Sequence, residues 1–161
     1  MNTPTIRIAT IPDIEEIIIL RYKLDSESAH LPYTAHDISI DYNLYAKLNV
    51  DIFYVLLEDN DKLIGFCSST SYTDDGTQSG CLVIGVLQEY TNQGYGKLLL
   101  DRIISITTFN GYNRLFLYVS ILNVVAISLY LKCNFKIVYT GYIEDGTENI
   151  YGRMHLLEYI P

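Results

Sequence analysis

Apolar and polar positions follow one another along this chain in segments whose lengths and periods predict a series of strands and helices. Residues 5–9 alternate between the two classes, which predicts a first strand. Thr10, Pro12 and Asp13 then have the composition of a helix start, and apolar residues recur at helical spacing to about Ser28. The chain therefore opens with a strand followed by an amphipathic helix.

The middle of the chain predicts further strands after a less regular stretch. Residues 30–36 have the composition of a loop, and residues 37–48 predict a tyrosine-rich helix. Strands are expected at residues 53–58 and 63–72, because the polar turn at 59–62 separates two apolar runs.

The second half alternates between strands and helices and ends in a hairpin. We expect a loop at 73–79, a strand ending near Val86, a helix from Gly94 to Gly111, a strand at 115–119, a helix from Asn123 to about Lys132, and a hairpin of residues 135–142 and 150–157. The continuous apolar run at 115–119 predicts a strand that is buried on both faces. This order of elements predicts a mixed α/β fold with one central sheet.

Composition narrows the class of protein. A chain of 161 residues that is 49% hydrophobic is most simply one domain, spanning residues 1–161. Three widely spaced cysteines lie in apolar runs, which predicts buried free thiols and a reducing cytoplasmic location. The three histidines lack metal-ligand spacing, so no metal site is expected. The N-terminus lacks the features of a signal peptide and no apolar run approaches twenty residues, so neither secretion nor a membrane span is expected.

The charge of the chain bears on its partners. The formal net charge is −8, which argues against nucleic acid, because binding a polyanion requires neutralisation of its phosphates by Lys and Arg. An acidic surface favours cationic small molecules or basic peptide ends.

Residues 86–100 form the most informative segment. An apolar run ends in a polar loop, passes through Gly94 and Gly96, and enters an apolar-periodic stretch. A helix that begins in this way presents free backbone N–H groups and the positive end of its dipole, and so forms an anion site. The same pattern is also typical of an ordinary turn. Leu99 stands where a dinucleotide fingerprint needs its third glycine, and Leu98 stands where a P-loop needs Ser or Thr, so both of those motifs are excluded.

A second segment, residues 115–135, places Asn123, Ala126 and Tyr130 on one helical face. The small Ala126 leaves room for a molecule against that face. Asn123 is equally explained as an N-cap, and Tyr130 as an amphipathic residue at the edge of the core. A different stripe is predicted to be core: Val124, Ile127 and Leu131.

Together, these two segments resemble the GCN5-related N-acetyltransferase (GNAT) family. Residues 86–100 are similar to the family's acetyl-CoA motif, Gln/Arg-x-x-Gly-x-Gly/Ala, and residues 117–135 are similar to its second signature. The resemblance implies the acyl-CoA N-acyltransferase fold, an α/β fold with a single mixed, mostly antiparallel central sheet flanked by helices. It also implies a cytoplasmic N-acetyltransferase that uses acetyl-CoA as cosubstrate and a primary amine of a small molecule or peptide as acceptor. Homodimers are common in such folds, and the sequence leaves the oligomeric state open.

The resemblance also implies roles for particular residues. The backbone of Ile84, Gly85 and Val86 would pair with the pantetheine arm of the cofactor. Asn123 would contact that arm, and Tyr130 would lie near the thioester sulfur and protonate the departing thiolate. The diphosphate would be held by the amides of Gln93, Gly94, Tyr95, Gly96, Lys97 and Leu98.

Three positions depart from the family pattern. Thr91 removes a long side-chain donor from the phosphate motif, and Asn92 stands where glycine is common. Asn134 replaces the glycine that usually precedes Phe135, a mild change because Asn tolerates left-handed backbone angles.

The general base is not assigned by the sequence. Gly80 and Tyr118 occupy positions where relatives often carry a glutamate. Glu89, His36, Glu148 and His155 are weaker candidates, and a chain of water molecules could serve instead. The acceptor site is expected between the 30–36 loop, the 37–48 helix and the 144–149 hairpin. Because the base is missing, a non-catalytic acyl-CoA-binding sensor on the same fold is the alternative function.

Overall fold

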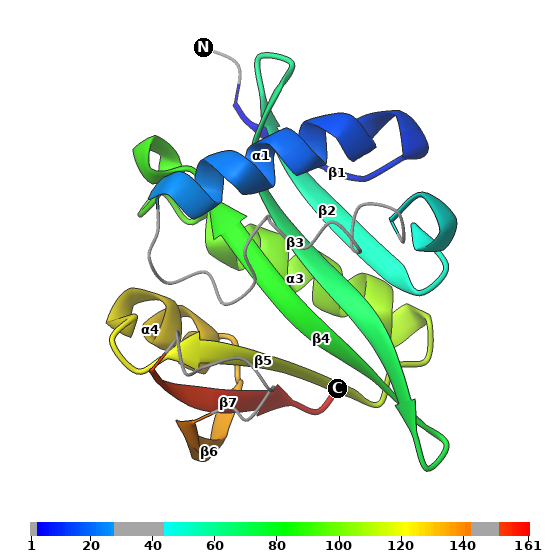
Figure 1. Cartoon of the computed structure of the whole chain (residues 1–161), viewed down its shortest axis with the longest axis vertical. Coiled ribbons are helices and arrows are strands. Elements are labelled where there is room, and N and C mark those ends of the chain that lie inside the picture. The colour runs from blue at the N-terminus through cyan, green and yellow to red at the C-terminus, as the bar shows by residue number, and fades with distance from the viewer. Residues whose placement is uncertain (1–2, 28–43, 143–151) are drawn as a thin grey trace.

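The computed structural model describes residues 3–27, 44–142 and 152–161, and its described strands form one seven-stranded sheet in the order β1-β2-β3-β4-β5-β7-β6 (Figure 1). The strands are β1 (Thr5–Ile8), β2 (Ile52–Asp59), β3 (Lys62–Asp74), β4 (Thr77–Val86), β5 (Arg114–Ser120), β6 (Lys136–Tyr142) and β7 (Arg153–Tyr159). Neighbouring strands are antiparallel except β4 and β5, which are parallel. The predicted mixed, mostly antiparallel central sheet is confirmed.

Helices lie on both faces of this sheet. The described helical elements are η1 (Ile11–Asp13), α1 (Ile14–Glu27), η2 (Gln88–Tyr90), α3 (Tyr95–Phe109) and α4 (Val124–Lys132), and residues 44–47 are also helical. In Figure 1, α1 crosses in front of the sheet and α3 lies behind it. The buried residues Leu99, Leu100 and Ile103 of α3 pack into the core against β2, β3 and β4. None of the helices in the described ranges is both long enough and apolar enough to cross a membrane.

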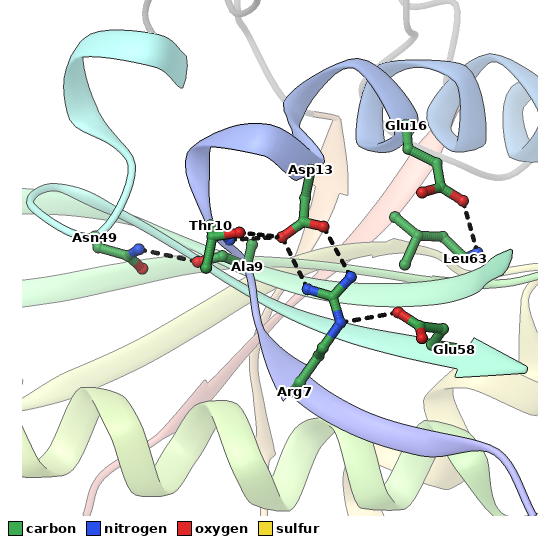
Figure 2. Close-up of polar contacts among 8 residues, drawn as sticks. All are labelled: Arg7, Ala9, Thr10, Asp13, Glu16, Asn49, Glu58 and Leu63. Atoms are coloured by element: carbon green, nitrogen blue, oxygen red, sulfur yellow. Dashed lines mark hydrogen bonds and ion pairs between the residues drawn. The ribbon is translucent and has the colours of Figure 1, made fainter. Parts of the chain in front are cut away.

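The first strand, the first helix and the second strand are joined by a polar network (Figure 2). Both oxygens of the Asp13 carboxylate accept hydrogen bonds of 2.8 Å from the Arg7 guanidinium, whose Nε donates to Glu58 at the same distance. Asp13 also accepts hydrogen bonds from the backbone N–H and the hydroxyl of Thr10. Thr10 thus lies immediately before the helical segment, as predicted. That segment begins with the short 3-10 helix η1 and continues as α1.

Two predictions about strands differ from the structure. The predicted loop at 73–79 is wrong: β3 and β4 form a tight hairpin, in which Asp75 and Gly76 adopt left-handed backbone angles with φ of 46° and 76°. The strand at 115–119 is not buried on both faces, because Phe116 and Tyr118 are half-buried while the residues between and beside them are buried. Tyr118 and Val119, two successive residues of β5, both line a cavity described below.

The stripe of α4 that was predicted to be core faces solvent instead. Val124 is 68% exposed and Leu131 is 47% exposed, and Ile127 is partly buried. The side of α4 that packs inward carries Ala126, Leu129 and Tyr130. Hydrophobicity alone could not distinguish the two stripes, because both consist of apolar residues.

Some predicted elements lie outside the described residues. These are the loop at 30–36, most of the helix at 37–48, and the turn of the closing hairpin. The hairpin strands themselves, β6 and β7, pair in antiparallel fashion as predicted.

Candidate active site

An opening between β4 and β5 is the central feature of the site. The two strands pair only where residues 79–81 meet residues 114–116, and beyond this point each continues without the other. A cavity of about 330 Å³ occupies the opening. Leu24 of α1 and Tyr95 of α3 both line it, so the cavity reaches both faces of the sheet.

The loop before α3 presents backbone amides to this cavity. Asn92 and Gly94 have φ of 60° and 85°, and Gly94 is the N-cap of α3 without any capping side chain. Leu98 N–H is the first amide of the helix to find an intrahelical acceptor, the carbonyl of Gly94 at 3.3 Å. Successive amides that precede it, together with the positive end of the helix dipole, form a concavity suited to an anion.

Gly94 in this loop and Gly96 in the first turn of α3 are each needed for a different physical reason. A Cβ at Gly94 would meet nothing within 4 Å, so its importance lies in the left-handed backbone. A Cβ at Gly96 would lie 2.9 Å from Leu129 Cδ2, so Gly96 permits close packing of α3 on α4. The sequence-based reason, clearance for a phosphate, fits the open space at Gly94.

Asn123 caps α4 and lines the same cavity. Its Oδ1 accepts a hydrogen bond of 3.2 Å from the backbone N–H of Ala126. This is the N-cap role that the sequence allowed. Its Nδ2 donates no hydrogen bond to any described residue, so the amide group can cap the helix and donate to a ligand at once.

Tyr130 is buried, with 6% of its surface exposed, and lines the cavity from the inward side of α4. Its ring lies 6.0 Å from that of Phe135, centroid to centroid. Burial raises the pKa of the Tyr130 hydroxyl well above its ordinary value, and the neighbouring Cys67 raises it further. The phenol therefore remains a proton donor throughout the physiological pH range.

Comparison with known families decides the identity of this arrangement. A model of the acetyltransferase (GNAT) family matches residues 14–135, which include the cavity loop, Asn123 and Tyr130. The chain belongs to the GNAT family.

Solved structures share this GNAT fold. A GNAT-family acetyltransferase from Streptococcus pneumoniae is 25% identical, with a TM-score of 0.79 and coverage of 99% of this chain and 100% of that one. The structure of yncA from Salmonella typhimurium, with its cofactor acetyl-CoA, is 16% identical with a TM-score of 0.81 and coverage of 99% and 94%. A spermidine N-acetyltransferase from Vibrio cholerae, in complex with CoA and spermine, is 20% identical with a TM-score of 0.74 and coverage of 98% and 95%. A search of curated proteins found no match.

Most of the site residues inferred from the GNAT resemblance lie at the cavity. Those that line it are Ile84, Gly85, Val86, Gly94, Tyr95, Gly96, Lys97, Asn123 and Tyr130. Two do not line it. The Gln93 side chain turns back and donates to the carbonyl of Glu89 at 3.2 Å, and the Leu98 side chain is 51% exposed.

The departures from the GNAT pattern have local explanations. Thr91 donates its hydroxyl to the carbonyl of Gln88 at 2.8 Å and so stabilises the turn before the amide loop. Asn92 and Asn134 adopt φ of 60° and 66°, conformations that explain why glycine is common at both positions. The predicted tolerance of Asn134 for a left-handed backbone is confirmed.

Sequence reasoning missed several lining residues. Leu24 comes from α1, and a Cβ at Gly85 would lie 2.8 Å from Leu24 Cδ1, so the helix packs directly on the backbone of β4. The missed set also includes Leu82, Val83, Tyr90, Val119, Val125 and Leu129. Leu24 is far in sequence from the other lining residues, and no motif around it indicates a role at the cavity. Leu129 could have been found, because it follows Ala126 by three residues on the inward side of α4.

The structure does not bring the described candidates for a general base together at the cavity. His36 and Glu148 lie outside the described residues, and Glu89 is an exposed residue of η2. His155 lies on β7, where its Nδ1 is 2.7 Å from the Thr140 hydroxyl. A Cβ at Gly80 would collide with the Ser69 hydroxyl inside the core, so a side chain at that position could not reach the cavity. No carboxylate or imidazole lines the cavity among the described residues.

A second cavity of about 310 Å³ lies on the α1 side of the sheet. Its described walls come from α1, from residues 44–52, and from one face of β2, β3 and β4. Val83 lines both cavities. A molecule in the second cavity would therefore be within reach of one held at the β4–β5 opening.

Proposed function

We propose that this protein is an acetyl-CoA-dependent N-acetyltransferase that moves an acetyl group to a primary amine of a small molecule or peptide by direct attack. One observation carries the proposal: a single cavity is lined both by the amide loop before α3 and by Tyr130. The first suits a diphosphate and the second suits a departing thiolate.

Acetyl-CoA is the cosubstrate, and the described residues fit it. Beyond residue 81, the β5-facing edge of β4 has no strand partner, so the backbone of Ile84, Gly85 and Val86 is available to pair with the pantetheine arm. The amides of residues 93–97 would hold the diphosphate, with the open space at Gly94 allowing its close approach. The Leu98 amide is not available, because it donates to the carbonyl of Gly94. Asn123 Nδ2 would donate to the cofactor arm.

The reaction needs an unprotonated amine and a protonated leaving group. The amine nitrogen attacks the thioester carbonyl, the C–S bond breaks, and the thiolate takes the proton of the Tyr130 hydroxyl, which then regains a proton from water. The amine loses its own proton to water, since no base lines the cavity among the described residues. The acceptor would occupy the second cavity, which shares the lining residue Val83 with the first.

The remaining expectations are part of the same proposal. We place the protein in the cytoplasm because all three cysteines are free and buried. We treat residues 1–161 as one GNAT-like domain that binds neither nucleic acid nor membrane. A homodimer remains a prediction from the family resemblance alone.

The test combines binding with turnover. Calorimetric titration of the full chain with acetyl-CoA should give saturable binding, and a panel of amines that includes peptides, polyamines and amino acids should release free CoA thiol. Binding without thiol release from any amine would favour the sensor instead. Absence of acetyl-CoA binding would overturn both functions.

A further inference from the structure

The described wall of the second cavity has a net charge opposite in sign to that of the whole chain. Arg21 of α1 and Lys47 line it together with one acid, Asp51, whereas the chain carries a net charge of −8. The described wall therefore has a net charge of +1, since two basic residues face one acidic residue. A wall with a net positive charge on an acidic protein favours an anionic group there.

Arg21 is the best placed of these groups. It is half-buried, and it forms no ion pair within 4.0 Å with any described residue. By contrast, Arg7 is paired with Asp13 and Glu58, and Arg114 is paired with Glu158. A guanidinium at a cavity wall that is partly desolvated, and that no described carboxylate neutralises, is suited to an anionic ligand.

The rest of the described wall suits a small polar molecule. Ser68 and Thr70 of β3 present hydroxyl groups beside the aromatic rings of Tyr54 and Phe66. Hydroxyl groups can donate to an oxygen anion, and the rings can cover a carbon skeleton. Asp51 lies on the same wall and offsets one of the two positive charges.

We infer that the acceptor is an amino acid or similar amino-carboxylate, whose carboxylate is bound by Arg21 while its amine points past Val83 toward the thioester. This inference rests on the proposed function. A carboxylate is favoured over a phosphate because one acid among two basic groups leaves a single positive charge, which balances a monoanion. The sequence favoured a cationic acceptor, and the inference narrows this to an acceptor that carries a negatively charged carboxylate as well as an amine.

Matched acceptors and matched variants test the inference. The acceptors are lysine against cadaverine, and phenylalanine against phenethylamine, which differ only by the carboxylate. We expect kcat/KM to be about tenfold higher or more for the carboxylate-bearing member of at least one pair. Arg21→Gln should remove this preference mainly by raising KM for the amino acid, while kcat/KM for the decarboxylated amine should not fall, because that amine has no carboxylate for Arg21 to bind.

Arg102→Gln is the control. Arg102 is an exposed residue of α3, on the other face of the sheet, so this substitution makes the same change of charge far from the cavity. It should leave the preference intact. Equal or better use of the decarboxylated amines in both pairs, or an equal loss for both members in Arg21→Gln, would overturn the inference.

A binding measurement separates failure of the inference from failure of the proposed function. If acetyl-CoA binds and no amine is acetylated, the proposed enzymatic function fails. Calorimetric titration of lysine into the acetyl-CoA-loaded chain then still decides the carboxylate site. Saturable binding that Arg21→Gln abolishes supports the site, and no binding, or binding that Arg21→Gln leaves unchanged, overturns it.

Discussion

Gly96 in the first turn of α3 lies directly against Leu129 of α4, so closely that a Cβ on Gly96 would be 2.9 Å from Leu129 Cδ2. These two residues belong to the two sequence motifs of the protein and both line the cavity. Their contact fixes the distance between the amide loop and the helix that carries Asn123 and Tyr130. We therefore expect Gly96→Ala to push α3 and α4 apart and to raise the Kd for acetyl-CoA about tenfold.

A compensating substitution tests this explanation. Leu129→Ala removes the atom that a Cβ at position 96 would meet, so the double variant should bind acetyl-CoA more tightly than Gly96→Ala alone. Isothermal titration of the wild type, both single variants and the double variant gives the coupling between the two positions. Independent, additive effects of the two substitutions would contradict the packing argument.

Tyr130→Phe tests the proton donor. The substitution keeps the ring that packs near Phe135 and removes only the hydroxyl. We expect kcat to fall about tenfold to a hundredfold, which is at or below the low end of general-acid effects, because a thiolate is a moderately good leaving group. The Kd for acetyl-CoA should be unchanged. Full kcat in the variant, measured by thiol release with the true acceptor, would remove Tyr130 from the mechanism.

The two functions of Asn123 can be separated by two substitutions. Asn123→Asp retains an oxygen that accepts from Ala126 N–H, so the cap and the thermal stability should be kept. It loses the Nδ2 donor and adds a negative charge, so acetyl-CoA binding should weaken. Asn123→Ala loses both functions, and its free energy of unfolding should fall by about 1 kcal/mol. Thermal melts and calorimetry on both variants provide the comparison, and unaltered acetyl-CoA affinity in Asn123→Asp would leave Asn123 as a cap alone.

The pH dependence of turnover reports on the base. Since no described residue at the cavity can take the amine proton, the free amine must be drawn from solution, and kcat/KM should rise about tenfold per pH unit below the acceptor's pKa, near 10 for a lysine-like amine. Ionisation of Tyr130 should not lower kcat/KM at alkaline pH, because burial raises the pKa of its hydroxyl. A plateau that begins near neutral pH would instead reveal a base with a pKa there, and His36→Ala would then be the first variant to measure.

Asp13→Asn tests the network in Figure 2. The hydrogen bonds from Arg7 hold the pKa of the Asp13 carboxyl well below its usual range, despite the opposing effect of burial. A depressed pKa in the folded state stabilises the fold above the unfolded pKa, about 3.9, and this stabilisation is lost as pH falls below that value. Near neutral pH we expect Asp13→Asn to lower the free energy of unfolding by about 2 kcal/mol, since Arg7 is partly exposed.

Acid titration of stability provides the check on that prediction. The difference between wild type and Asp13→Asn should shrink as pH falls below about 4. Asp101→Asn is a suitable control, because the Lys97–Asp101 pair is exposed to solvent and should contribute little to the free energy of unfolding at any pH. A penalty for Asp13→Asn that is independent of pH would mean that packing, and not the ion pair, is responsible.

Much of this protein could be predicted from the sequence, because its signals are local. The left-handed turn at Gly94, the helix start that follows it and the cap at Asn123 depend on residues a few positions apart. Strand and helix periods are likewise set within single segments, so the order of elements was predicted from the chain. Boundaries were less certain, and the tight β3–β4 turn at Asp75 and Gly76 was missed because that polar stretch is equally typical of a longer loop.

The remainder was decided by contacts between distant segments. The opening between β4 and β5 exists because their pairing ends at residues 81 and 116, and no pattern within either strand marks that point. No local pattern marks the direction in which α4 packs, which places Tyr130 inward and Val124 outward. No local pattern indicates that Leu24 of α1 contacts the backbone at Gly85 either. A short-range pattern fixes the conformation of a segment, whereas a cavity and its charge are created when separate segments pack together. The sequence by itself therefore determined the motifs, and the tertiary structure alone brought Arg21 and Lys47 to a cavity that shares Val83 with the proposed cofactor site.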